Sequence, residues 1–169
     1  MNKYRMTARV VGMVYLAGFV VGIAGNLMIQ SIPGGINHLS AISANSMTVA
    51  ISASLWLMAV AGDATHGVLM FPIQKQHSES IAIGYQSARI VDAVFIAIMV
   101  LLIFIQIPLG SEFLKASSTG TSYLQSLSTL FAQSQQYAYE IGMISLGLAG
   151  LMLCYTLYRS KLVPQWLAL

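Results

Sequence analysis

Asp63 and His66 are the two residues of this sequence whose types and spacing point most clearly to chemistry. They lie three positions apart in an apolar stretch of membrane-spanning length, so on a helix their side chains share one face. Three roles suit such a pair. It can satisfy its own polarity by hydrogen bonding inside the protein, helped by Thr65 and the tyrosines of the fourth apolar stretch. It can relay protons or couple an ion to transport through a deep carboxylate. Finally, His66 can bind haem or a metal.

The structural role is the one that we favour for this pair. Structural zinc needs four ligands, and a bis-histidine haem would need a second copy of His66 from a homodimer. Proton-coupled transport through Asp63 is the main alternative, and haem or metal binding through His66 is the second. The sequence contains no HExxH, GxSxG, P-loop or GxGxxG motif. We therefore predict a non-enzymatic protein with no catalytic residue, no cofactor and no metal.

Three further charged residues, Arg89, Asp92 and Glu140, are secondary candidates. With a helix rise of 1.5 Å per residue, Asp63 lies about 18 Å from Lys75, near the middle of a membrane. Asp92 lies only about 4.5 Å beyond Arg89, and we expect these two to pair near the inner interface. We place Glu140 near the outer interface. The sequence thus predicts three acids at three depths, which argues against a single carboxylate site.

The composition shows which environment must surround these residues. Of the 169 residues, 57% are hydrophobic and only 8% are charged, whereas a soluble chain carries about 25% charged residues. These few charges cannot cover a water-exposed surface. We therefore predict that the lipid bilayer is a partner of this protein and surrounds most of its surface. The net charge of +3 comes from basic residues beside hydrophobic segments, which predicts no nucleic-acid partner.

Four apolar stretches are long enough to cross a hydrocarbon core of about 30 Å. They cover about residues 10–29, 47–73, 90–109 and 137–158. We expect a polar connection at 74–89 and a long one at 111–136, with an amphipathic outer helix at about 121–134. Pro164 suggests the start of a fifth span. The prediction is one all-α membrane domain, residues 1–169, forming a polytopic bundle of four complete spans and the start of a fifth.

Basic residues predict the orientation of this bundle. If the N-terminus is cytoplasmic, Lys115 is the single basic residue in the outer connections, against seven in the inner segments. The seven are Lys3, Arg5, Arg9, Lys75, Arg89, Arg159 and Lys161. Because cytoplasmic segments carry the excess of Lys and Arg, we expect both termini to be cytoplasmic.

Glycines indicate where the spans approach one another. Gly18 and Gly22 form a GxxxG motif in the first span, and Gly147 and Gly150 lie in the fourth. Such residues let two membrane helices pack closely. We favour contacts within the bundle, with a homo-oligomer through these faces as the alternative.

Three segments resemble a family of bacterial multi-pass membrane proteins known as domain of unknown function 4386. They are Thr-Ala-Arg-Val-Val-Gly-Met-Val-Tyr-Leu-Ala-Gly at 7–18, Ala-Arg-Ile-Val-Asp-Ala at 88–93 and Leu-Tyr-Arg-Ser-Lys-Leu-Val-Pro-Gln-Trp-Leu at 157–167. Asp63 falls where the family often has an acidic residue. The resemblance implies the bacterial inner membrane and a chain shortened at its C-terminus, but no activity. Our interpretation is therefore a structural or interaction protein of that membrane.

Overall fold

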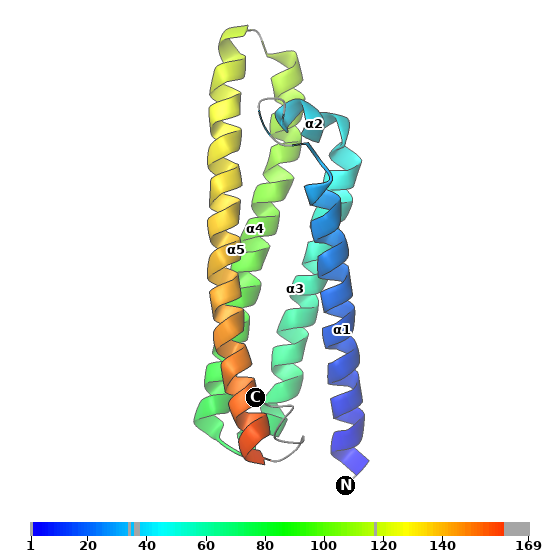
Figure 1. Cartoon of the computed structure of the whole chain (residues 1–169), viewed down its shortest axis with the longest axis vertical. Helices are drawn as coiled ribbons and strands as arrows, with labels where there is room; N and C mark the ends of the chain where they lie inside the picture. The colour runs from blue at the N-terminus through cyan, green and yellow to red at the C-terminus, as the bar shows by residue number, and fades with distance from the viewer. Residues whose placement is uncertain (1, 34, 36–37, 117, 161–169) are drawn as a thin grey trace.

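The computed structural model describes residues 2–33, 35, 38–116 and 118–160, and it is helical almost throughout (Figure 1). The helices are α1 (Asn2–Gln30), α2 (His38–Ala44), α3 (Ser46–Lys75), α4 (Glu79–Lys115) and α5 (Ser118–Ser160). All but α2 are long and apolar enough to cross a membrane, and the described residues include no strand. The predicted all-α, multi-span fold is confirmed. The expected start of a fifth span lies outside the described residues.

The four long helices pack in the order of the sequence. α1 packs against α3, α3 against α4, and α4 against α5, while α2 lies mainly on α4. Figure 1 shows that α1 begins, and α5 ends, at the end of the bundle that also holds the turn between α3 and α4. We call this the terminal end, and the opposite end, which holds α2 and the turn between α4 and α5, the α2 end.

The helix α4 begins earlier than the sequence suggested. The stretch 74–89 was expected to be a connection, but only residues 76–78 separate α3 from α4. The Ser78 hydroxyl accepts a hydrogen bond from the amide of Ile81 at 3.4 Å, and Glu79 lies in the first turn. Both features stabilise a helix N-terminus. Arg89 therefore lies well inside α4 rather than in an interfacial loop.

The helix α5 is also longer than expected. The predicted amphipathic helix at 121–134 and the predicted span at 137–158 are parts of one continuous helix, and only residues 116–117 separate it from α4. No proline or glycine occurs between residues 121 and 141 to interrupt it. With 43 residues, α5 is about 65 Å long, twice the hydrocarbon core of about 30 Å. The Gln- and Ser-rich part at the α2 end extends beyond that core.

Two apolar clusters form the interior, with polar residues between them. The cluster toward the α2 end includes Ile42, Val49, Val100 and Ile103, and the cluster toward the terminal end consists of Val11, Met70, Tyr85, Ala88 and Ala149.

The glycines named from the sequence do not behave alike. A Cβ built on Gly22 would lie 3.7 Å from the Cβ of Ala59, so this glycine contacts α3, and Gly18 faces the same residue. Around Gly147 and Gly150, no atom lies within 4 Å of such a Cβ. These two glycines therefore provide no close helix approach within the described chain, contrary to the packing role that we favoured, whereas the GxxxG motif of α1 lies against α3.

Candidate functional site

Arg89 is the centre of the candidate site. Its side chain is only 2% exposed although it carries a full charge. Nη2 lies 2.5 Å from Oδ1 of Asp63 and donates to the backbone oxygen of Asp63 at 3.4 Å. Nη1 lies 3.5 Å from Oδ2 of Asp92. One guanidinium thus joins an acid on α3 to an acid on its own helix, and we call these three residues the Arg89 cluster.

The short turn between α3 and α4 explains why these residues meet. Asp63 precedes Lys75, the end of α3, by twelve residues, and Arg89 follows Glu79, the start of α4, by ten. Both are therefore about 15–18 Å from the turn. Asp92 lies one helical turn further along α4. The prediction of three acids at three depths was wrong for Asp63 and Asp92, because it treated the first ten residues of α4 as a loop.

The Arg89 cluster lies at the middle of the apolar part of the bundle. The apolar segment of α1 runs from Arg9 to Gln30, and Gly18 lies close to its midpoint. A Cβ on Gly62 would lie only 3.7 Å from the Cα of Gly18, so the neighbouring Asp63 is level with that midpoint. This placement rests on a contact between two helices and is independent of any counting from the helix ends.

His66 is buried, but its hydrogen bond goes to α4 rather than to Asp63. Its Nδ1 lies 2.7 Å from the hydroxyl of Tyr85, and its ring centroid lies 5.1 Å from that of Tyr15 on α1. The structure thus gives Asp63 and His66 different partners. Thr65 takes no part, since its hydroxyl donates to the backbone oxygen of Ala61. The rings of Tyr15, His66 and Tyr85, here called the aromatic layer, lie on the terminal-end side of Asp63.

The Arg89 cluster carries more acid than base. With both carboxylates ionised, two negative charges face one guanidinium, which leaves one negative charge in excess. Asp92 is fully buried, whereas the side chain of Asp63 is 31% exposed. Nε of Arg89 and Oδ1 of Asp92 have no hydrogen-bond partner among the described residues. Asp63 is therefore the carboxylate through which the cluster meets its surroundings.

Asp63 opens onto a cavity of about 220 Å³ between α1 and α5. Its floor comes from α3, with Trp56, Ala59 and Asp63. The wall from α1 consists of Tyr15, Gly18, Phe19, Gly22, Ile23 and Asn26, and the wall from α5 consists of Tyr139, Met143 and Leu146. Asp63 is the single charged residue in this lining.

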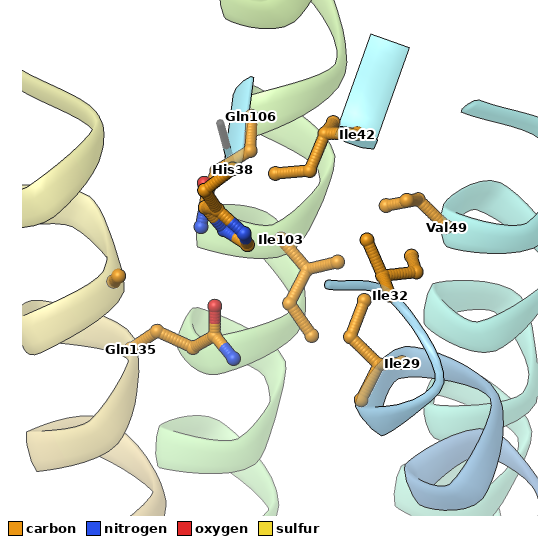
Figure 2. Close-up of a pocket in the computed structure, with 9 residues that line it drawn as sticks. Ile29, Ile32, His38, Ile42, Val49, Ile103, Gln106 and Gln135 are labelled. Carbon is orange, nitrogen blue, oxygen red and sulfur yellow. The ribbon is translucent and has the colours of Figure 1, made fainter. Parts of the chain in front are cut away.

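Further cavities continue from Asp63 toward the α2 end. A cavity of about 270 Å³ shares Asn26, Trp56 and Tyr139 with the first. A third, of about 180 Å³, shares Gln135 with the second. Figure 2 shows the third cavity, where Gln135 reaches inward from α5 and Ile29 lies on the opposite side. The three cavities adjoin through these shared residues, in a row from the α2 end to Asp63, and we call this row the groove.

Glu140 does not join the Arg89 cluster. Its side chain is exposed and accepts a hydrogen bond from Gln136, one turn earlier on α5, at 2.9 Å. Among the residues that the structure describes, no group of three or more His, Cys, Asp or Glu side chains could hold a metal ion. Binding of a metal or haem by His66, the second alternative from the sequence, is supported by no cluster of ligands among these residues.

The sequence pointed to the tyrosines of the fourth apolar stretch, which include Tyr139, but to neither Tyr85 nor Trp56. Tyr85 is the partner of His66, and Trp56 and Tyr139 meet edge to face with ring centroids 6.3 Å apart. Tyr85 could have been found from its spacing, since Tyr85, Arg89 and Asp92 recur at intervals of four and three, as one face of a helix does. The meeting of Trp56 with Tyr139 depends on how α5 lies relative to α3 and has no local signal.

Comparison with known proteins gives one match. A family model described as Domain of unknown function (DUF4386) matches residues 10–169. Neither a curated protein nor a solved structure matches the chain. The family resemblance seen in the sequence is thereby confirmed, and it covers all four long helices.

Proposed function

The chain belongs to the family Domain of unknown function (DUF4386), and we propose that it is a membrane transporter for a small molecule. In this proposal the groove is the substrate path, and Asp63 is the group that binds either a proton or the substrate. One observation carries the proposal: a carboxylate at the middle of the apolar part of the bundle is paired with a buried arginine and also opens onto a groove. The integral membrane character of the chain rests on its four long apolar helices.

The charges of the Arg89 cluster support this role. Each charged side chain at the centre of a membrane costs about 2.5–3.5 kcal/mol on insertion scales. A cluster with a purely structural role is expected to be neutral and closed. The Arg89 cluster has one carboxylate in excess, and this carboxylate is the exposed one. Binding one monovalent cation neutralises the cluster, so a proton and a cationic substrate would compete for the cluster, which is the basis of coupled exchange.

The ends of the groove differ in a way that suits alternating access. Toward the α2 end, the cavities follow one another from Asp63 outward. Toward the terminal end, the aromatic layer and the cluster around Val11 and Met70 follow Asp63. A cavity of about 340 Å³ near His77 and Arg159 lies beyond them and shares no lining residue with the groove. In this proposal, the groove gives access to Asp63 from the α2 end. Movement of α1 or α5 against the closely packed α3 and α4 would open the other side.

For the orientation, we propose cytoplasmic termini in a bacterial inner membrane. Arg89 no longer counts as an inner-loop charge, because it is buried in α4. Among the described residues, five basic ones still belong to the terminal end, against Lys115 at the α2 end. The five are Lys3, Arg5, Arg9, Lys75 and Arg159. This excess supports the orientation, in which the groove opens to the outside of the cell.

A structural or interaction role, which the sequence favoured, is the second candidate and is supported by the ion pair itself. The Arg89–Asp63 contact ties α3 to α4, as a packing device would. The two candidates differ in water access, since a structural cluster needs none.

Cysteine labelling from each side of the membrane tests the transporter proposal. Cys154 is the only cysteine in the sequence, so Cys154→Ser gives a cysteine-free background. Met143 lines the groove, and its neighbour Ile144 faces outward with 73% exposure, which makes a matched pair on one helix. We expect Met143→Cys to react with membrane-impermeant methanethiosulfonates, cationic and anionic, from the outer side. Ile144→Cys should stay unlabelled in lipid, where a thiol does not ionise.

The labelling separates the two candidates. If Met143→Cys is as unreactive as Ile144→Cys from both sides, the groove is dry and the structural role is the better explanation. Labelling from the cytoplasmic side alone would instead contradict the proposed orientation.

A further inference from the structure

We propose that the cavity at Asp63 binds an organic ammonium cation that carries an apolar or aromatic group. This inference rests on the proposed function, because it names the substrate class of the same site. Three features of the described residues carry it, namely the charge of the Arg89 cluster, the aromatic lining of the cavity and the shape of the space in front of Asp63.

The charge decides the sign of the ligand. Arg89 has two acidic partners, and the one that opens onto the cavity is Asp63. The described cavity lining contains no basic residue that could hold an anion. A ligand with one positive charge brings the cluster to neutrality, which a membrane interior favours. An anion in the same place would face the excess negative charge.

The aromatic lining favours an organic cation over a bare metal ion. Trp56 and Tyr139 meet edge to face at one side of the cavity, and Tyr15 and Phe19 line the α1 side. Tryptophan, tyrosine and phenylalanine faces attract ammonium groups within about 6 Å, most strongly when desolvated. An alkali or divalent ion needs several oxygen ligands, whereas the lining offers the carboxylate of Asp63 with few other oxygens.

The space fits a molecule with an apolar part. The cavity has a volume of about 220 Å³, and an apolar cavity of about 150 Å³ is enough to bind benzene. A single aromatic ring with a methylated ammonium group is of this size. The remaining lining, which includes Ile23, Met143 and Leu146, is apolar. A ligand that places its charge at Asp63 and its apolar part against these residues satisfies both parts of the cavity.

Phenyltrimethylammonium and its neutral carbon isostere, tert-butylbenzene, provide a direct test on the purified full-length protein. The sequence has two tryptophans, Trp56 and Trp166. In a Trp166→Phe background, Trp56 in the cavity lining becomes the only tryptophan and reports occupancy by its emission. We expect saturable binding of the ammonium probe and at least tenfold weaker binding of the neutral isostere. Isothermal titration calorimetry with the unmodified chain checks the affinity independently of the reporter.

Variants separate charge from packing. Asp63→Asn should weaken binding of the ammonium probe at least tenfold. Asp92 lies outside the cavity lining, but Asp92→Asn also removes the excess negative charge of the cluster and should weaken binding several-fold. Glu140→Gln is the matched control, since it makes the same chemical change at an exposed acid outside the cavity, and it should leave the affinity unchanged. Tyr139→Leu removes an aromatic wall without changing charge and should weaken binding as well. It provides the test if Asp63→Asn does not fold.

The inference is wrong if the neutral isostere binds as tightly as the ammonium probe, or if folded Asp63→Asn keeps the affinity of the unmodified chain. Equal weakening by Glu140→Gln and Asp92→Asn would also overturn it, since the effect would then reflect overall charge. These outcomes are distinct from failure of the proposed function. A groove that labels at Met143→Cys but binds no ammonium ion contradicts only the ligand class.

Discussion

Replacing Arg89 by glutamine should destabilise the protein far more than replacing either of its acidic partners by the matching amide. Arg89→Gln keeps a polar side chain of moderate length but removes the positive charge that Asp63 and Asp92 share. Two carboxylates then remain at the middle of the apolar zone without a counter-charge. Asp92, which is fully buried, has no route to water.

The expected size follows from burial and charge. Removing one partner of a buried ion pair typically costs about 3–5 kcal/mol, because it leaves an uncompensated buried charge. We expect Arg89→Gln to fall in that range. Asp63→Asn leaves Arg89 with Asp92, a neutral pair, so the lost contact is offset by the removal of the excess charge. Its cost should be about 1 kcal/mol or less, the size of a single net hydrogen bond.

Equilibrium unfolding in mixed micelles, followed by far-ultraviolet circular dichroism, measures these differences. The double variant Arg89→Gln with Asp92→Asn completes the comparison. It removes the fully buried acid that Arg89→Gln strands, so it should recover about 2 kcal/mol of the loss. Residues in one charge network are coupled on this scale.

Two results would refute this reasoning. Arg89→Gln costing no more than Asp63→Asn would show that the guanidinium does not compensate both acids. Failure of Asp92→Asn to rescue Arg89→Gln would show that the loss comes from packing of the long arginine side chain rather than from charge.

Three further substitutions test the surrounding contacts by thermal unfolding in detergent. Ser52→Ala removes the buried hydrogen bond from the Ser52 hydroxyl to the Gly25 oxygen, at 2.6 Å between α3 and α1, and should cost about 1 kcal/mol; an unchanged melting temperature would contradict the contact. Tyr85→Phe leaves Nδ1 of His66 without its 2.7 Å partner and should cost about 1–3 kcal/mol. In a His66→Phe background, the same substitution should cost less. Gly147→Ala has no neighbouring atom to displace and should be neutral or stabilising by up to about 1 kcal/mol, whereas a clear loss of stability would reveal a partner at this face.

The four apolar helices could be predicted because contact with lipid requires long apolar stretches, which are visible directly in the sequence. The pairing of Arg89 with Asp92 could also be predicted, since a spacing of three on a helix is a local property, and the structure contains that contact. The beginning of α4 could not be recognised by hydropathy, because residues 79–89 are mixed in polarity. Ser78 followed by Glu79 was the available signal for that start.

The partner of Asp63 lay beyond the reach of local patterns. Which residue faces Asp63 depends on the register of α3 against α4, and the three-residue turn fixes this register. An error of eleven residues in the start of α4 therefore displaces Arg89 by about 16 Å. The groove depends on a different non-local fact, the spacing between α1 and α5. These two helices are at opposite ends of the sequence. Their spacing is set by the packing of α1 on α3, α3 on α4 and α4 on α5.

The short turn between α3 and α4 also has a consequence for biogenesis. Asp63 and Arg89 lie on the two arms of one helical hairpin, so α3 does not have to enter the bilayer with Asp63 unpaired, at about 2.5–3.5 kcal/mol. Since α1, α3, α4 and α5 pack in the order in which they are synthesised, each arriving helix finds its neighbour already in place. The ion pair between Arg89 and Asp63 therefore lowers the cost of inserting α3 and α4 as one hairpin.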